Sequence, residues 1–173
     1  MIIQTDRLHM AQITTEDWAL FQSLNREPEV IRLCFDEPSP SDMKEAFESR
    51  LPAWDRDSTH WLCLTITNKE TAEKIGVTGF RLDNEVAEVG YLFLPQFHRM
   101  GFGTESLKAL IQWAMEEQGI QSFQAIVTEG NIGSEKVLTK SGFALQKVVP
   151  DAYTIGGKKY ADHIYSLGSN PQN

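Results

Sequence analysis

Residues 86–115 constrain the fold of this chain more than any other stretch, because a short strand passes through a glycine loop directly into a helix. Residues 86–94 (VAEVGYLFL) are typical of a buried strand, and Pro95 ends it because proline has no N–H for a ladder. A loop follows, and the spacing of Leu107, Leu110, Ile111 and Ala114 then predicts a packed helix. A strand that delivers glycines to a helix N-terminus gathers free N–H groups at the positive end of the helix dipole, where phosphate commonly binds.

The glycine loop is compatible with several phosphate sites, of which two are disfavoured. Gly101-Phe102-Gly103 alone is a weak motif, because glycines often only relieve a tight turn. A P-loop is excluded, since no Gly-Lys-Ser/Thr follows. A Rossmann site is disfavoured because a third glycine is missing and the preceding strand belongs to an antiparallel hairpin.

The rest of the chain predicts one α+β domain with a mostly antiparallel sheet. Strands are expected at residues 8–13, 60–67, 74–82, 85–94, 123–127, 143–149 and 158–167. A tight turn at Asp83-Asn84 makes its neighbours antiparallel. Gly76, Gly79 and Gly90 within strands indicate bulges or close backbone approach, and a bulge near Gly90 would splay the sheet. Helices are expected after caps at Thr14 and Ser41 and over residues 131–140. The domain is expected to span residues 1–168, and residues 169–173 to form a frayed tail.

Composition narrows the class of partner. The net charge of −8 argues against nucleic-acid binding and would favour a cationic partner. Residues 1–6 do not resemble a signal peptide, and no apolar run is long enough for a bilayer, so a cytoplasmic protein without a membrane partner is expected. Cys34, Cys63 and four scattered histidines form neither a zinc set nor a disulfide framework, so no metal is expected.

Four stretches resemble one family in the right order. Residues 98–103 resemble the Gln/Arg-x-x-Gly-x-Gly/Ala pyrophosphate loop of the GNAT acyltransferases, although His98 replaces the usual first residue. Residues 6–8 (DRL) resemble the Glu-Arg-Leu of the RimJ/RimL branch of that family, and residues 162–167 resemble its closing strand. Residues 131–143 (NIGSEKVLTKSGF) match its Asn-x-x-Ser-x-x-Val-Leu-x-Lys-x-Gly-Phe pattern, which is the most specific part.

The resemblance implies a GNAT fold, with a mixed sheet of about seven strands flanked by helices and splayed between the fourth and fifth strands. It implies acetyl-CoA as cosubstrate, bound in the splay by backbone groups at the end of the preceding strand, by the glycine loop and by the start of the next helix. The residues implied are Leu92, Phe93, Leu94, Arg99, Met100, Gly101, Phe102, Gly103, Thr104, Asn131 and Ser134.

Two residues are candidates for proton transfer. Glu88 is either a base or an anchor for the substrate's amine, acting directly or through water, or else an edge carboxylate that is exposed or paired with Arg81. By resemblance, Ser134 or a water would return a proton to the leaving thiolate, because Leu138 occupies the position where many GNAT enzymes carry a tyrosine as general acid. Asn131 also suits a plain helix N-cap, and Cys63 suits core packing better than a nucleophile.

The chemistry expected is direct acetyl transfer to a neutral amine. An N-terminal α-amine loses its proton at a cost of roughly 1.4 kcal/mol at neutral pH, against about 4–5 kcal/mol for lysine. A site with Glu88 as its one candidate base suits the acceptor that is easier to deprotonate, the α-amine. The RimJ/RimL resemblance implies that the acceptors are N-terminal amines of ribosomal proteins. A small-molecule amine or drug as acceptor, and a non-catalytic acyl-CoA-binding module, stay open as alternatives, as do a monomer and a homodimer.

Overall fold

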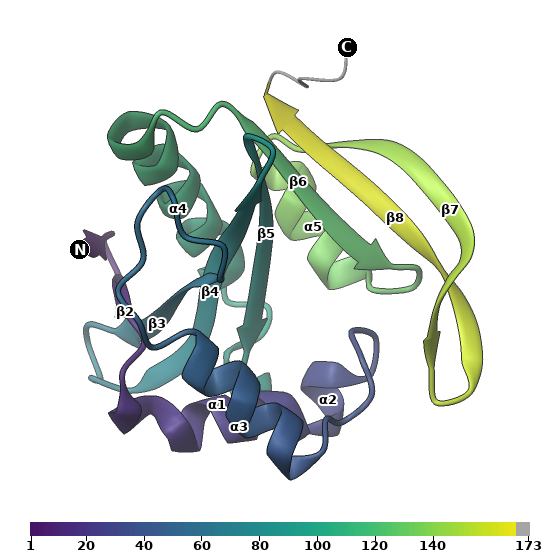
Figure 1. Cartoon of the computed structure of the whole chain (residues 1–173), viewed down its shortest axis with the longest axis horizontal. Helices are drawn as coiled ribbons and strands as arrows, with labels where there is room; N and C mark the ends of the chain where they lie inside the picture. The colour runs from purple at the N-terminus through teal and green to yellow at the C-terminus, as the bar shows by residue number, and fades with distance from the viewer. Residues whose placement is uncertain (169–173) are drawn as a thin grey trace.

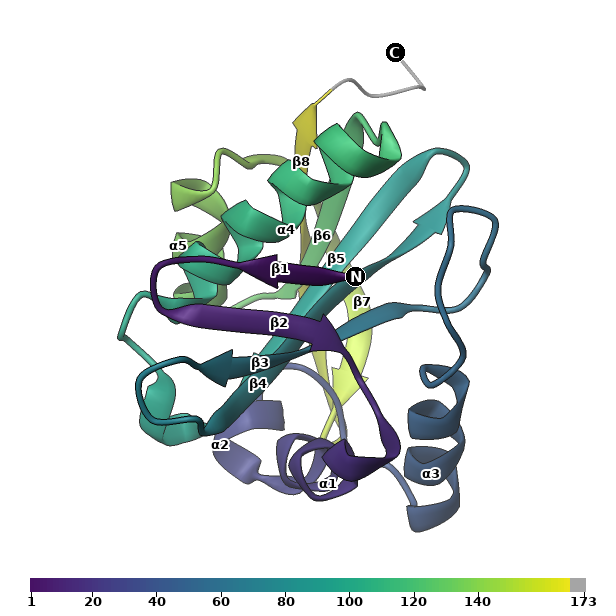
Figure 2. The ribbon, with the colours of Figure 1, turned by 90° about the vertical axis from the view of Figure 1, so that its left-hand side faces the viewer.

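Eight strands form one sheet in the order β1-β2-β3-β4-β5-β6-β8-β7 (Figures 1 and 2). The computed structural model describes residues 1–168, and the predicted tail at 169–173 lies outside them. The strands are β1 (Ile2–Gln4), β2 (Leu8–Gln12), β3 (Leu62–Asn68), β4 (Lys74–Asp83), β5 (Val86–Phe93), β6 (Ser122–Thr128), β7 (Ala144–Ile155) and β8 (Lys158–Gly168). The α+β class and the mixed sheet are confirmed, and β1 is one strand more than the expected seven.

Helices cover both faces of the sheet. The first group is α1 (Trp18–Arg26), α2 (Pro28–Ile31) and α3 (Pro40–Ser49), preceded by a 3₁₀ turn at Thr15–Asp17. The second group is α4 (Phe102–Gln118) and α5 (Ile132–Lys140), and a further 3₁₀ turn at Pro95–Phe97 precedes α4. Figures 1 and 2 show α1–α3 gathered at one end of the molecule and α4 and α5 together on the opposite side.

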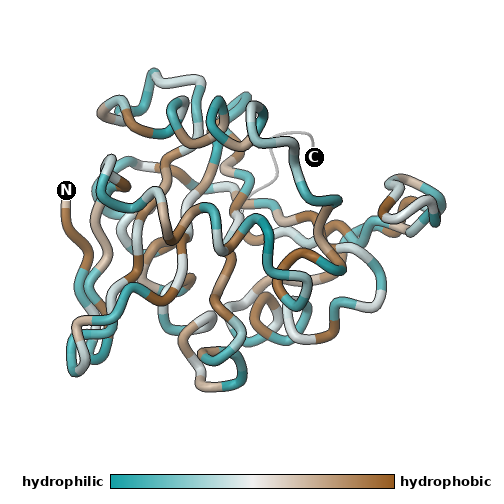
Figure 3. Tube along the Cα trace, turned by 90° about the horizontal axis from the view of Figure 1, so that it is seen from below, coloured by the Kyte–Doolittle hydropathy of each residue, from teal (hydrophilic) through white to brown (hydrophobic). Residues whose placement is uncertain are grey.

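Each helix group has its own buried core. The larger core joins α4 to one face of the sheet through side chains such as Leu107, Phe80 and Phe123. The smaller core joins α1–α3 to the other face through Phe21 and Phe47, among others. Figure 3 shows the corresponding hydrophobic segments running through the middle of the trace. Because successive side chains of a strand alternate between faces, β5 contributes to both cores.

The sheet is antiparallel except between β5 and β6, and that junction opens the molecule. The two strands pair only over Val86–Glu88 and Ser122–Gln124. Beyond Glu88 they diverge as a V (Figure 1). The predicted splay is therefore confirmed, but the predicted bulge at Gly90 is wrong, because the register between β4 and β5 runs without a shift. The splay arises from the departure of β6.

Local sequence explains the two connections nearest the splay. The β4–β5 turn is Asn84-Glu85, one residue later than expected, and both residues have positive φ (49° and 67°). Two positive φ values give the type I′ turn that matches strand twist. Thr14 and Asp17 form the expected capping box. Ser39 caps α3 by accepting from the Asp42 N–H, so the expected cap at Ser41 is wrong. No helix within residues 1–168 is long and apolar enough to span a membrane.

Candidate active site

A cleft of about 1020 Å³ fills the V between β5 and β6. One wall comes from α1, α2 and the residues after α3, and the other from the N-terminal end of α4 and one side of α5. Every residue predicted from the sequence to bind or react lies on this cleft, except Leu94 and Met100, which flank it. Strand, loop and helix residues that are far apart in the chain therefore meet at one place.

The register of β5 determines which backbone groups face the cleft. The Leu94 N–H donates to the Ile75 carbonyl at 3.0 Å, so the opposed residues Phe93 and Gly76 form a non-hydrogen-bonded pair. The N–H and C=O of Phe93, and by alternation those of Tyr91, consequently point toward the splay, whereas those of Leu92 point toward β4. Backbone contacts to the ligand were expected from Leu92, Phe93 and Leu94. The backbone groups of Phe93 point toward the splay as such a contact requires, and those of Tyr91 do so in place of Leu92.

His98 ties the end of β5 to the glycine loop. Its Nε2 lies 2.7 Å from the Phe93 carbonyl oxygen. A carbonyl only accepts, so Nε2 carries the proton in this hydrogen bond. His98, which departs from the family pattern, thus donates a hydrogen bond to one of the backbone carbonyls that β5 points into the splay. The Phe93 N–H and the Tyr91 backbone groups are left for a ligand.

The glycine loop presents the N-terminus of α4 to the cleft. Arg99 and Gly101 have positive φ (62° and 82°), and these two left-handed residues turn the chain into the helix. The Glu105 N–H donates to the Gly101 carbonyl at 3.1 Å. The N–H groups of the three preceding residues have no earlier carbonyl in the helix and point out of its end. This arrangement suits a phosphate.

Arg7 holds this loop from behind. Its Nε donates to Glu105 Oε1 at 2.7 Å and its Nη1 to the Met100 carbonyl at 3.0 Å. The guanidinium also lies 4.3 Å from the ring centroid of Phe102. Burial alone would raise the pKa of Glu105, but hydrogen bonds from Thr5 and Arg7 lower it below its usual value. Arg7, part of the DRL motif, therefore braces the predicted pyrophosphate loop.

Cationic side chains surround the phosphate end of the cleft. Arg99 lies in the loop, and Lys136 and Lys140 line the cleft from α5. The two lysines are one helical turn apart and share a helix face. Sequence reasoning found Arg99 and missed the lysines, although their i, i+4 spacing within the most specific motif could have identified them.

A pair of hydroxyls lies at the middle of the cleft. Tyr91 Oη is 2.8 Å from Ser134 Oγ and 3.2 Å from the Ser134 carbonyl oxygen. Burial raises the pKa of Tyr91 to about 12, so its hydroxyl stays protonated at neutral pH. The Ser134 N–H donates to Asn131 Oδ1 at 3.3 Å, so Asn131 is the N-cap of α5. Tyr91 was missed because it lies within an apolar strand.

Glu88 points to the opposite face from Tyr91, toward α1–α3. It lines the cleft and is half-buried. Arg81 lies directly across from it on β4, yet no ion pair joins the two in the described part of the chain. Cys63 is buried in the smaller core, and burial raises the pKa of its thiol to about 12. The Cys63 thiol is therefore a poor nucleophile, as expected.

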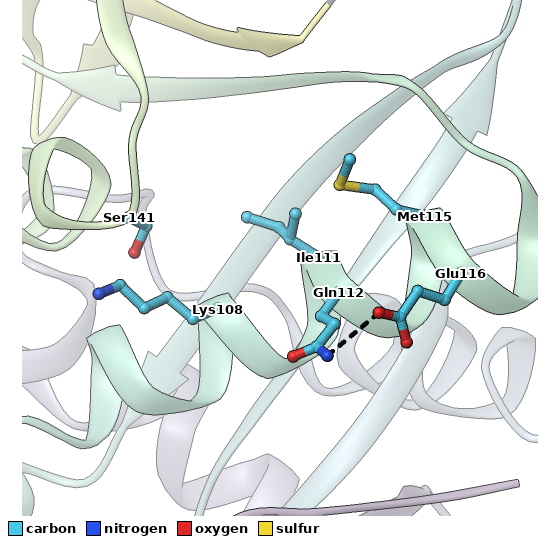
Figure 4. A pocket seen from close by; sticks show the side chains of 6 residues that line it. All are labelled: Lys108, Ile111, Gln112, Met115, Glu116 and Ser141. Atoms are coloured by element: carbon cyan, nitrogen blue, oxygen red, sulfur yellow. Dashed lines mark hydrogen bonds between the residues drawn. The ribbon is translucent and has the colours of Figure 1, made fainter.

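Two features lie apart from this chemistry. A hollow of about 250 Å³ runs along α4 beside Lys108, Ile111 and Ser141 (Figure 4), and no predicted site residue lines it. Leu138 is fully buried, so the position at which many GNAT enzymes carry a tyrosine faces the core. The tyrosine hydroxyl in the cleft is that of Tyr91 on β5.

Comparison with known proteins decides the family. The model of the acetyltransferase (GNAT) domain matches residues 7–144. The chain belongs to the GNAT family of acetyltransferases. It is 27% identical over 174 residues to the uncharacterized N-acetyltransferase YoaA of Bacillus subtilis (strain 168), covering 96% of each chain. This GNAT chain is therefore an acetyl-CoA-dependent N-acetyltransferase.

Solved structures share the fold at low sequence identity. RimL, described as a ribosomal L7/L12 α-N-protein acetyltransferase in complex with coenzyme A, superposes with a TM-score of 0.85. The match has 19% identity and covers 97% of this chain and 98% of RimL. The microcin C7 self-immunity acetyltransferase MccE, in complex with acetyl-CoA and AMP, gives 0.76 at 21% identity over 95% and 94%. RimL and MccE thus hold coenzyme A and acetyl-CoA, respectively, on the fold that this chain shares.

Proposed function

We propose that this GNAT enzyme transfers the acetyl group of acetyl-CoA to the N-terminal α-amine of a protein, with a ribosomal protein as the first candidate. The observation that supports this most is Glu88, the one carboxylate that lines the cleft from the sheet; it is half-buried and has no ion-pair partner among residues 1–168, whereas Glu29, which lines the cleft from α2, is exposed. One carboxylate suits an α-amine, which costs only roughly 1.4 kcal/mol to deprotonate at neutral pH. The fold similarity to RimL over nearly the whole chain supports the same acceptor class.

In this proposal the cofactor lies in the splay. The N–H groups at the start of α4, with Arg99 and the two lysines of α5, bind the pyrophosphate. The backbone of Tyr91 and Phe93 binds the pantetheine arm as an added strand would. The side-chain amide of Asn131 contacts the same arm while its Oδ1 caps α5.

The reaction is a direct transfer. The neutral amine attacks the thioester carbonyl carbon, a C–N bond forms and the C–S bond breaks. Glu88, directly or through a water, accepts the proton that the amine loses. The coenzyme A thiolate receives a proton from Ser134, and Tyr91, whose hydroxyl lies 2.8 Å away, returns a proton to the serine hydroxyl. Glu88 then releases its proton to solvent and Tyr91 regains one from solvent, which restores the site. Because Tyr91 and Ser134 are both neutral before the reaction, they donate without first having to take up a proton.

An acceptor panel tests the proposal. The purified protein receives acetyl-CoA and either peptides that begin with Ser or Ala, the same peptides with a blocked N-terminus and one internal lysine, or aminoglycosides and polyamines. Thiol release gives the rate and mass spectrometry locates the acetyl group. We expect acetylation of the free N-termini alone. Faster acetylation of a small amine would favour the small-molecule alternative, and heat protection by acetyl-CoA without any turnover would favour the binding module.

A further inference from the structure

Arg50, directly after α3, is a cation with no use in the chemistry described so far. It is half-buried and lines the acceptor side of the cleft. Its Nη1 donates to the Ala46 carbonyl at 2.8 Å, and this is the one side-chain hydrogen bond of its guanidinium within residues 1–168. A guanidinium has five N–H donors in a planar fork, so most of its hydrogen-bonding capacity is unused.

Arg50 also lacks a counter-charge. Arg7 and Arg56 pair with Glu105 and Glu85, each at 2.7 Å, whereas no carboxylate of residues 1–168 pairs with Arg50. Burial lowers the pKa of Arg50. The nearby Cys63 thiol, whose pKa burial raises to about 12, is neutral and supplies no negative charge. A partly desolvated cation without a partner is costly, unless a ligand provides the anion.

The surroundings of Arg50 form a recess with aromatic walls. Its guanidinium carbon lies 5.7 Å from the ring centroid of Phe21 and 5.9 Å from that of Trp61. The Trp61 ring lies against Gly90, where an added Cβ would meet it at 3.4 Å. Gly90 and Glu88 share a face of β5, so the recess continues along the sheet to the proposed base.

We propose that Arg50 binds a carboxylate of the acceptor, so that the substrate is an amine with an acidic group a few bonds away. The amine then points to Glu88, and the carboxylate receives a two-pronged hydrogen bond from the Arg50 fork between the Phe21 and Trp61 rings. This inference rests on the proposed function and narrows it to protein N-termini with Asp or Glu in the first few positions. The α-carboxylate of a free amino acid has the same chemistry and is the other source to test.

Matched peptides test the recess without any mutation. Peptide amides that begin with Ser carry Glu or its isostere Gln at position 2, 3 or 4, so that the side chain is the sole carboxylate. We expect kcat/KM to be at least about tenfold higher for the Glu peptide at one position, the usual effect of a charged hydrogen bond. Equal values at all three positions overturn the inference for protein acceptors. Free serine compared with serine amide gives the second arm, and discrimination there alone would assign the carboxylate to a small acceptor.

Variants then assign the discrimination to Arg50. Arg50→Met should bring the Glu/Gln ratio close to one, and Arg50→Lys should restore part of it. Arg26→Gln changes an exposed arginine of α1 and should keep the ratio. Retained heat protection of Arg50→Met by acetyl-CoA shows that its fold persists. A ratio that survives in Arg50→Met overturns the assignment.

A failure of the proposed function can be distinguished from a failure of the Arg50 inference. If neither peptide nor amino acid is acetylated, the proposed function fails. The recess is then tested by heat protection of the enzyme–coenzyme A complex with the Glu and Gln peptides. Protection by the Glu peptide alone, lost in Arg50→Met, supports the recess, and no difference overturns it.

Discussion

Replacing Arg7 by Gln should weaken acetyl-CoA binding, although Arg7 is proposed to touch the loop and not the cofactor. The residues on either side of Met100 are in left-handed conformations, with φ of 62° at Arg99 and 82° at Gly101. A non-glycine residue there costs on the order of 1–3 kcal/mol and persists only when neighbours hold it. The Arg7 side chain is the neighbour that does so, through the Met100 carbonyl.

The size of the effect follows from three contacts. The ion pair with Glu105 has 46% and 21% of its two side chains exposed, and such a pair contributes about 0.2–1 kcal/mol. The hydrogen bond to Met100 adds about 1 kcal/mol. The position over the Phe102 ring adds about 0.5–1 kcal/mol. Losing roughly 2 kcal/mol of loop order reduces the population that can bind phosphate, so the Kd for acetyl-CoA should rise by between about threefold and about thirtyfold, the upper value being the full effect of that free energy.

Isothermal titration of acetyl-CoA into the purified variant measures the Kd, and thermal unfolding measures stability. Arg56→Gln is the matched control, because Arg56 forms an ion pair of the same 2.7 Å length with Glu85, beside the β4–β5 turn. We expect the control to lose a little stability and to keep its Kd within about twofold. An Arg7→Gln variant whose Kd also stays within about twofold would refute the bracing role.

Three further predictions concern single residues. Tyr91→Phe should lower kcat by about tenfold to a thousandfold with little change in acetyl-CoA Kd, since it removes a proton donor; an unchanged kcat in steady-state kinetics contradicts this. Gly103→Trp should abolish acetyl-CoA heat protection, because an added Cβ there already lies 3.0 Å from Val137 Cγ2 and an indole ring would have to displace α5 or block the glycine loop; Gly133→Ala, in open space, should be tolerated. Asp17→Asn should lower stability at pH 7 by roughly 2 kcal/mol. Burial raises the pKa of Asp17, but hydrogen bonds and charge from Lys74, Thr14 and Thr65 lower the pKa overall. The stability that the ionised Asp17 contributes is therefore present above pH 3.8 and is lost as pH falls through the lower folded pKa. Denaturant unfolding at pH 7 and pH 3 should show this loss.

The half of the cleft proposed to bind the cofactor was predictable from the sequence, because its proposed chemistry depends on backbone groups and on local spacing. The glycine loop lies directly between a strand and a helix, so its role follows from neighbours in the chain. The expected splay depends on where β6 leaves β5, which the family pattern implied and the pairing confirmed. The predicted bulge at Gly90 was wrong because β4 and β5 pair through Gly90 without a shift in register.

The acceptor half was less predictable because it is made by side chains from distant segments. Arg50 and Trp61 come from the connection between α3 and β3, which has no periodic pattern to mark them. Tyr91 was overlooked for a related reason: within an apolar strand, a tyrosine is normally assigned to the core. Its contact with Ser134 spans 43 residues of chain, a long-range pairing that local sequence does not indicate.

The alternation of β5 explains why the enzyme needs a splayed sheet. Tyr91 and Glu88 are three residues apart, so their side chains point to opposite faces. Tyr91 meets Ser134 of α5 on one face, and Glu88 faces α1–α3 on the other. In a continuous sheet the next strand would pair along β5 and separate the proposed acid from the proposed base. Because β6 leaves β5 after Glu88, the two faces connect through the gap beside Val89–Phe93. A thioester in that gap can be reached by an amine from one face and be protonated on sulfur from the other.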